Sequence, residues 1–95
     1  DLMIVRDCLV HLSHVEALAA LRNIAKQNVK YVAITSFVNT EVNSDAPTPA
    51  WRFMNLQKAP YNLPMPIAIL VEQCLEADGA ADDKSLYIYR IDQLQ

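Results

Sequence analysis

The chain has 95 residues, of which 53% are hydrophobic and 20% are charged, and its formal net charge is −3. This length suits one small domain, and so much apolar content excludes intrinsic disorder. The eight Lys and Arg residues are scattered rather than clustered, which argues against nucleic acid or an anionic membrane surface as a partner.

The apolar stretches and the cysteines indicate the cellular compartment of the protein. The longest apolar stretch, 66–71, is far shorter than the roughly 20 residues of a membrane-spanning helix. No secretory signal is visible. Cys8 and Cys74 form no CxxC pair, and we interpret them as two buried thiols in a reducing compartment, with a structural disulfide as the alternative. We therefore expect a cytoplasmic protein with no membrane partner.

The first element is a strand. Asp1 is followed at once by four apolar residues, Leu2–Val5, a run that is typical of a strand covered on both faces, as in a parallel sheet. A natural domain seldom begins inside such a strand. We therefore expect that a longer protein or a partner segment supplies its neighbour.

A helix and a second strand follow. Ser13 and Glu16 have the spacing of a capping box, which predicts a helix from His14 to about Gln27 with an apolar face at three- and four-residue spacing. Residues 29–37 are rich in β-branched and aromatic side chains, as in a strand. Strand, helix and strand form a βαβ unit, so the two strands should be parallel.

The second half of the chain begins with an irregular segment. Residues 38–66 hold all five prolines together with Trp51, Asn55 and Tyr61, and we interpret them as an ordered lid rather than a linker. Residues 67–75 predict a third strand, with a short helix as the alternative. After a turn at Asp78–Gly79, residues 86–91 predict a last strand, antiparallel to the third. The fold class is therefore α/β, a parallel βαβ unit followed by an antiparallel strand pair, in a single domain spanning 1–95.

Four sequence blocks carry a resemblance. They are Arg6-Asp7-Cys8-Leu9-Val10-His11-Leu12-Ser13, Trp51-Arg52-x-x-Asn55-Leu56, Pro60-Tyr61-Asn62-Leu63-Pro64-x-Pro66 and Asp83-Lys84-Ser85-Leu86. Together they resemble a bacterial branch of uncharacterised class I S-adenosylmethionine-dependent methyltransferase domains. The resemblance covers nearly the whole chain and implies the C-terminal half of a Rossmann-like sheet, from its fourth to its seventh strand.

The resemblance also implies site residues. It places Arg6, Asp7 and His11 beside the cofactor, with Arg6 and Asp7 in contact with it and Asp7 and His11 as catalytic candidates. Trp51, Asn55 and Tyr61 become candidates for substrate binding. The glycine-rich loop with which this family binds S-adenosylmethionine is not in the sequence, whose one glycine is Gly79. We therefore expect the complete enzyme to use this cofactor and the chain alone to bind none.

Each candidate has a purely structural alternative. Asp7 and Arg6 could only hold their loop together, and His11 could be a hydrogen-bonded structural histidine rather than a general base. His11 and His14 do not complete a metal site, and we expect none, with His14 in an exposed first turn of the helix. Trp51 and Tyr61 could stack a flat substrate or pack as core.

Two functions remain open. The first is the substrate-side part of a methyltransferase, inactive alone, with a small-molecule or protein methyl acceptor. The second is a non-catalytic interaction module that acts as a homo-oligomer. In both, the strand at Leu2–Val5 lacks a neighbour at its outer edge and one sheet face lacks helices. We expect this surface to be buried between subunits or against the other half of a larger protein, unless the 38–66 segment folds back over it.

Overall fold

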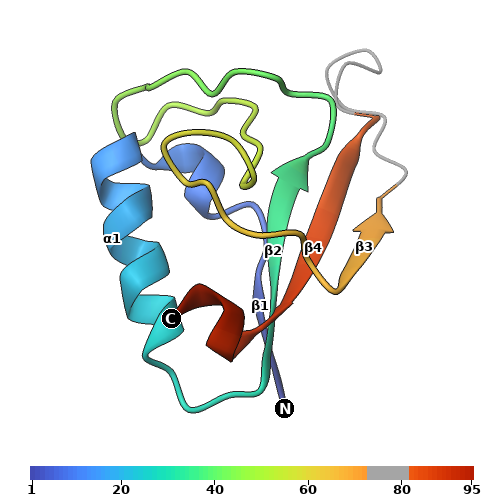
Figure 1. Cartoon of the computed structure of the whole chain (residues 1–95). Helices are drawn as coiled ribbons and strands as arrows, with labels where there is room; N and C mark the ends of the chain where they lie inside the picture. Colours follow the sequence, from blue (N-terminus) through green and yellow to red (C-terminus); the bar gives the residue numbers. More distant parts are fainter. Residues whose placement is uncertain (73–81) are drawn as a thin grey trace.

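The computed structural model describes residues 1–72 and 82–95 (Figure 1). In chain order, its elements are β1 (Leu2–Val5), the 3-10 helix η1 (Leu9–His11), α1 (His14–Ala25), β2 (Tyr31–Phe37), β3 (Ala68–Val71), β4 (Lys84–Arg90) and the 3-10 helix η3 (Ile91–Leu94). The predicted turn at Asp78–Gly79 and the end of the predicted third strand lie outside the described residues.

The four strands form one open mixed sheet in the order β1-β2-β4-β3. β1 and β2 are parallel neighbours, with Leu2 opposite Tyr31 and Val5 opposite Ile34. β4 runs antiparallel to both β2 and β3, and β3 lies at the outer edge. The parallel βαβ unit, the antiparallel pair and the α/β class are thus confirmed.

The connection between the parallel strands begins as its sequence predicts. Ser13 is extended, with φ −61° and ψ 163°, and its Oγ accepts a hydrogen bond from the Glu16 N–H at 3.3 Å. This side chain satisfies one of the four N–H groups that a helix start leaves without a partner. α1 ends at Ala25, two residues before the predicted end.

The core lies on one face of the sheet. α1, η1 and the loop between β2 and β3 all cover this side, which we call the covered face (Figure 1). Side chains alternate along a strand, so Val32 and Ile34 of β2 and Tyr87 and Tyr89 of β4 all point into this core. Leu9, Val10, Ala17, Leu21, Met54, Leu56 and Tyr61 complete the cluster.

The opposite face of the sheet is open. Leu2 and Ile4 of β1 are 51% and 61% exposed, and Leu70 of β3 is 54% exposed. In this chain β1 is therefore covered on one face only, and the apolar patch expected from the missing helices is exposed on the other face. The 38–66 segment covers the open face only at the end of β2, where Trp51 and Phe53 pack against Phe37, whereas its Met54 and Leu56 are buried in the core cluster on the covered face.

Two smaller expectations concern single features. Cys8 is exposed rather than buried, and Cys74 lies outside the described residues. Within the described residues, no helix is long and apolar enough to cross a membrane.

Candidate functional site

The candidate site lies at the carboxyl ends of β1 and β2. Arg6 and Asp7 directly follow β1, and the long loop directly follows Phe37 at the end of β2. In open sheets with parallel strands, ligands bind at this end because the chain turns away there and leaves a crevice. The sequence-predicted residues therefore lie at the chemically suitable end of the sheet.

Asp7 is the most constrained of them. Its φ of 55° is in the left-handed region, which costs a non-glycine residue about 1 kcal/mol or more. Its N–H donates to Thr35 Oγ1 at 2.8 Å, and its carboxylate lies 2.6 Å from Lys84 Nζ. Lys84 is buried, with a side chain only 7% exposed. Thr35 of β2 thus holds the Asp7 backbone, and Lys84 of β4 holds its carboxylate, at the carboxyl end of β1.

Arg6 has a different partner. Its Nε donates to Glu72 Oε2 at 3.0 Å, just beyond the end of β3. In the structural alternative, Arg6 and Asp7 hold their loop together by pairing with each other. Instead, Arg6 pairs with Glu72 and Asp7 pairs with Lys84, both from the second half of the chain. The resemblance includes Lys84 in its Asp83–Leu86 block, but sequence reasoning gave it no role. The predicted strand begins at residue 86, two residues after Lys84, so no pattern in the sequence indicated that this lysine is buried in β4.

His11 contacts the long loop after β2. It is exposed at the end of η1, and its Nδ1 is 3.2 Å from the carbonyl oxygen of Pro49. A carbonyl only accepts, so this contact requires the proton on Nδ1 and leaves Nε2 as the basic nitrogen.

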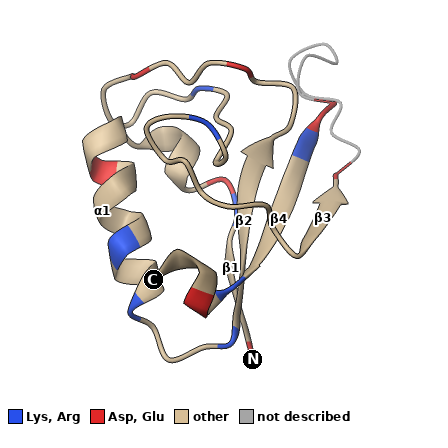
Figure 2. Ribbon diagram, in the orientation of Figure 1, with Lys and Arg blue, Asp and Glu red and all other residues tan. Residues whose placement is uncertain are grey.

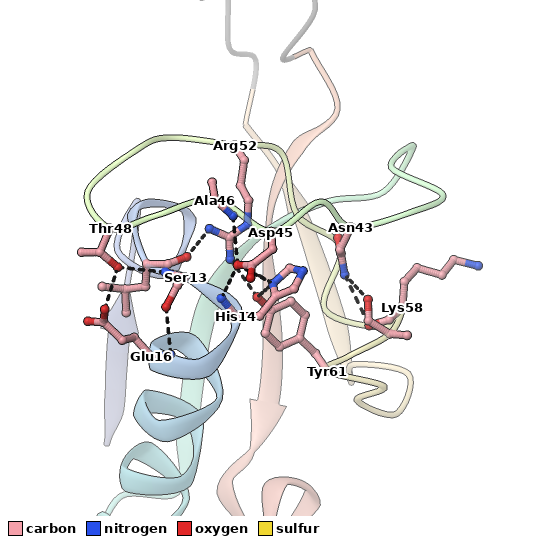
Figure 3. Close-up of polar contacts among 12 residues, drawn as sticks. Ser13, His14, Glu16, Asn43, Asp45, Ala46, Thr48, Arg52, Lys58 and Tyr61 are labelled. Atoms are coloured by element: carbon pink, nitrogen blue, oxygen red, sulfur yellow. Dashed lines mark hydrogen bonds and ion pairs between the residues drawn. The ribbon is translucent and has the colours of Figure 1, made fainter.

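His14 belongs to a cluster that fastens the loop to the start of α1, which we call the clamp (Figure 3). Arg52 Nη2 donates to Tyr61 Oη at 2.8 Å, and Tyr61 Oη lies 2.7 Å from His14 Nδ1. The tyrosine hydrogen is then free to donate to the histidine. The His14 N–H donates to Asp45 Oδ1 at 2.8 Å, and Arg52 Nη1 donates to the Leu12 carbonyl.

The sequence predicts an exposed His14, and this prediction is wrong. Its side chain is only 18% exposed, because the loop folds over it. Burial raises the pKa of Tyr61, while the hydrogen bond from Arg52 opposes this shift. The backbone N–H of His14 holds the pKa of Asp45 below its usual range. These contacts mark the clamp as a structural fastening.

The three predicted substrate-binding residues are not brought together on one surface. Asn55 and Tyr61 are buried and bonded internally; the Asn55 Nδ2 donates to the carbonyl of Thr40 at 3.1 Å. Trp51 is 41% exposed and borders a hollow in the loop. Of the three, only Trp51 offers a surface to a ligand in this structure.

Charge is distributed along the molecule rather than concentrated. Figure 2 shows Lys and Arg residues on α1, on the loops and near the ends of β4. In the described part of the chain, no three His, Cys, Asp or Glu side chains gather as a metal site would require.

These features define a small α/β domain with a four-stranded mixed sheet, open on one face. Comparison of the chain with protein-family models, with curated proteins and with solved structures found no match in any of the three.

Proposed function

We propose that the chain forms the substrate-side part of a class I S-adenosylmethionine-dependent methyltransferase domain. The observation that carries the proposal is the strand order. β4 lies antiparallel between β2 and β3, so β3 runs parallel to β2 without touching it. A plain doubly wound sheet adds its strands in parallel, whereas the Rossmann-like methyltransferase sheet ends in this reversed insertion.

The residues after β1 support the same function. S-adenosylmethionine supplies an activated methyl group when it is bound at the carboxyl ends of the strands. Asp7 presents a carboxylate at that end, and its second oxygen retains capacity to accept a hydrogen bond beside Lys84. His11 Nε2 is suited to accept a proton from a methyl acceptor.

These residues fit only one side of such a cofactor. The Asp7 carboxylate is already neutralised by a buried ammonium group, and Arg6 is paired with Glu72. Close backbone approach to the methionine end needs glycine, and the sequence has one, Gly79. We therefore propose that a complementary segment, placed beside β1, supplies most of the cofactor contacts.

The open surface of β1 is where that segment would pack. Leu2 and Ile4 are exposed on the open face, and β1 is an edge strand whose outer backbone groups can pair with another strand. One strand added beside β1, with a helix laid over Leu2 and Ile4, would bury both features.

The test compares the chain with the reading frame upstream of Asp1. If the frame encodes a strand followed by a glycine-rich loop, the longer product should bind S-adenosylmethionine in titration calorimetry. Asp7→Ala should weaken that binding at least about tenfold, whereas Glu41→Ala, a change of an exposed loop acid, should not. The 95-residue chain alone should show no measurable binding. Micromolar affinity of the chain alone, or a start codon next to Asp1 with no such loop, would contradict the proposal.

The open face also favours a second function, that of a non-catalytic module which associates with itself. Exposed apolar side chains on a sheet face, next to an unpaired strand edge, are typical of an interface. Sedimentation over a range of concentrations tests it. A dimer that forms at micromolar concentration supports self-association, and a persistent monomer at high micromolar concentration rules it out.

A further inference from the structure

The loop after β2 contains a hollow of about 410 Å³ at the same end of the sheet as Asp7. Its lining residues are Thr40, Val42, Ser44, Trp51, Arg52 and Phe53, and we call it the Trp51 hollow. We propose that the Trp51 hollow binds a planar, uncharged heteroaromatic ring. If the proposed function holds, this ring is the recognition element of the methyl acceptor, so the inference on the acceptor rests on that function.

The aromatic wall of the hollow is anchored in the fold. Trp51 meets Phe37 edge to face with ring centroids 5.8 Å apart, and it meets Phe53 in the same way at 4.7 Å. Phe37 ends β2 and is completely buried, so it fixes the other two rings. Trp51 nevertheless remains 41% exposed. Exposed indole surface held in one orientation is suited to stack against a flat ring.

The opposite wall is fastened to the same part of the loop. Asn43 accepts a hydrogen bond from the Asn55 N–H at 2.7 Å, and its own amide donates to the carbonyls of Asn55 and Ala59. These bonds hold Asn43, between the lining residues Val42 and Ser44, against residues 55–59 of the same loop. The hollow is thus formed before any ligand binds, which lowers the entropic cost of binding.

The polar groups of the hollow determine which ring fits. Thr40 and Ser44 line the hollow, and within the described residues their hydroxyls make no hydrogen bond. The guanidinium of Arg52 donates to Leu12 and Tyr61 in the clamp. No carboxylate or ammonium group is among the residues that line the hollow. Two hydroxyls beside an indole suit a neutral ring with a nitrogen or hydroxyl at its rim.

Quinoline, which is neutral near pH 8, is a direct probe. The chain has one tryptophan, so the indole N–H gives a single side-chain signal in a nitrogen-edited NMR spectrum. Titration with quinoline should shift this signal and the amides of residues 40–44 and 51–53 in a saturable way. For a fragment of this size, the dissociation constant should be on the order of a millimolar.

Two matched substitutions locate the binding site. Val42 lines the hollow and is 79% exposed, whereas Val15 is 73% exposed on α1. Val42→Phe should fill the hollow and abolish the saturable shifts, and Val15→Phe should leave them unchanged. Shifts confined to the open face at Leu2 and Ile4, or a Val42→Phe chain that still binds, would overturn the inference.

This result is separable from the proposed function. Quinoline binding is measured on the chain alone, whereas cofactor binding is measured on a longer product. A chain that binds quinoline while its longer product ignores S-adenosylmethionine would retain the hollow as a ligand site and refute the methyltransferase. The reverse outcome would refute only the hollow.

Discussion

At the scale of single residues, the carboxyl end of β1 is held by charge pairs of unequal burial. Lys84 is buried beside Asp7, whereas Arg6 is 56% exposed beside Glu72. A charge removed from water contributes to stability only if its partner stays in place. An exposed pair contributes little, because water screens it and side-chain entropy opposes it. The pair with Lys84 therefore fixes the left-handed turn at Asp7.

Lys84→Met should destabilise the chain by about 1–2 kcal/mol, since it keeps the buried stem and leaves the half-exposed Asp7 carboxylate unpaired. Arg90→Met, which removes only the exposed pair with Asp92, is the matched control and should cost less than about 0.5 kcal/mol. Urea unfolding followed by circular dichroism measures both. Equal costs for the two variants would show that burial does not distinguish the pairs.

Buried tyrosines predict a loss of stability in alkali. Burial raises the pKa of Tyr87 and of Tyr89, and the shift is larger for Tyr89. Because the folded state holds these protons more tightly than the unfolded state, the stabilisation is present below the ordinary tyrosine pKa of about 10 and is lost as pH rises above it. The urea concentration at the unfolding midpoint should therefore decrease as the pH is raised from about 10 to about 12.

Tyr89→Phe should reduce the slope of that alkaline loss, although it also removes the hydrogen bond from Tyr89 to the Pro64 carbonyl. Tyr31→Phe, at a ring that is 39% exposed, is the control. The prediction fails if both substitutions leave the same pH dependence as the parent chain.

At the scale of elements, the long loop behaves as a second layer of the fold. It contributes Met54 and Leu56 to the core and is fastened to α1 by the clamp. Asp45 accepts the His14 N–H, and Thr48 accepts the Ser13 N–H at 2.9 Å. The loop thus supplies acceptors for the helix start, where backbone N–H groups lack partners and negative charge is favoured. Its irregular sequence therefore does not imply a loose lid.

Asp45→Ala should release the start of α1 from the loop. The pKa of Asp45 is held low, so its contribution is present above the ordinary carboxyl pKa and is lost as pH falls below it. At neutral pH, hydrogen exchange at the His14 and Ala46 amides should become at least about tenfold faster. Glu41→Ala, a change of another exposed acid in the same loop, is the control. Unchanged exchange at His14 would refute the role of Asp45.

At the scale of the whole molecule, the two faces of the sheet differ in what packs against them. Both faces carry apolar side chains, but α1 and most of the loop lie on one of them, and the other is covered only around Phe37 (Figure 1). β1 to β3 have no charged residue, and β4 has charges only at its ends, Lys84 and Arg90 (Figure 2). Both charges alternate with Tyr87 and Tyr89 and so lie on the open face, but between them this face is apolar and has little protection against association.

Ile4→Lys tests the open face directly. Ile4 is 61% exposed in the chain, so this substitution should change the free energy of unfolding by less than about 0.5 kcal/mol. If the chain associates through this face, a lysine there should shift the sedimentation coefficient to that of a monomer. Val15→Lys, on the outer surface of α1, should leave the assembly unchanged. A loss of several kcal/mol in Ile4→Lys would show that Ile4 is covered in the chain itself.

The sequence by itself determined the elements and their directions. Ser13 and Glu16 located the helix start, β-branched runs located the strands, and a short helix between two strands made them parallel, because such crossovers are local and geometrically restricted. Only the tertiary structure decided the pairing of Asp7 with Lys84 and the clamp of His14, Arg52 and Tyr61. These contacts join residues far apart in the chain, and no local pattern encodes them. Nor could a run such as Leu2–Val5 reveal which of its faces is covered, since that depends on what packs against the sheet.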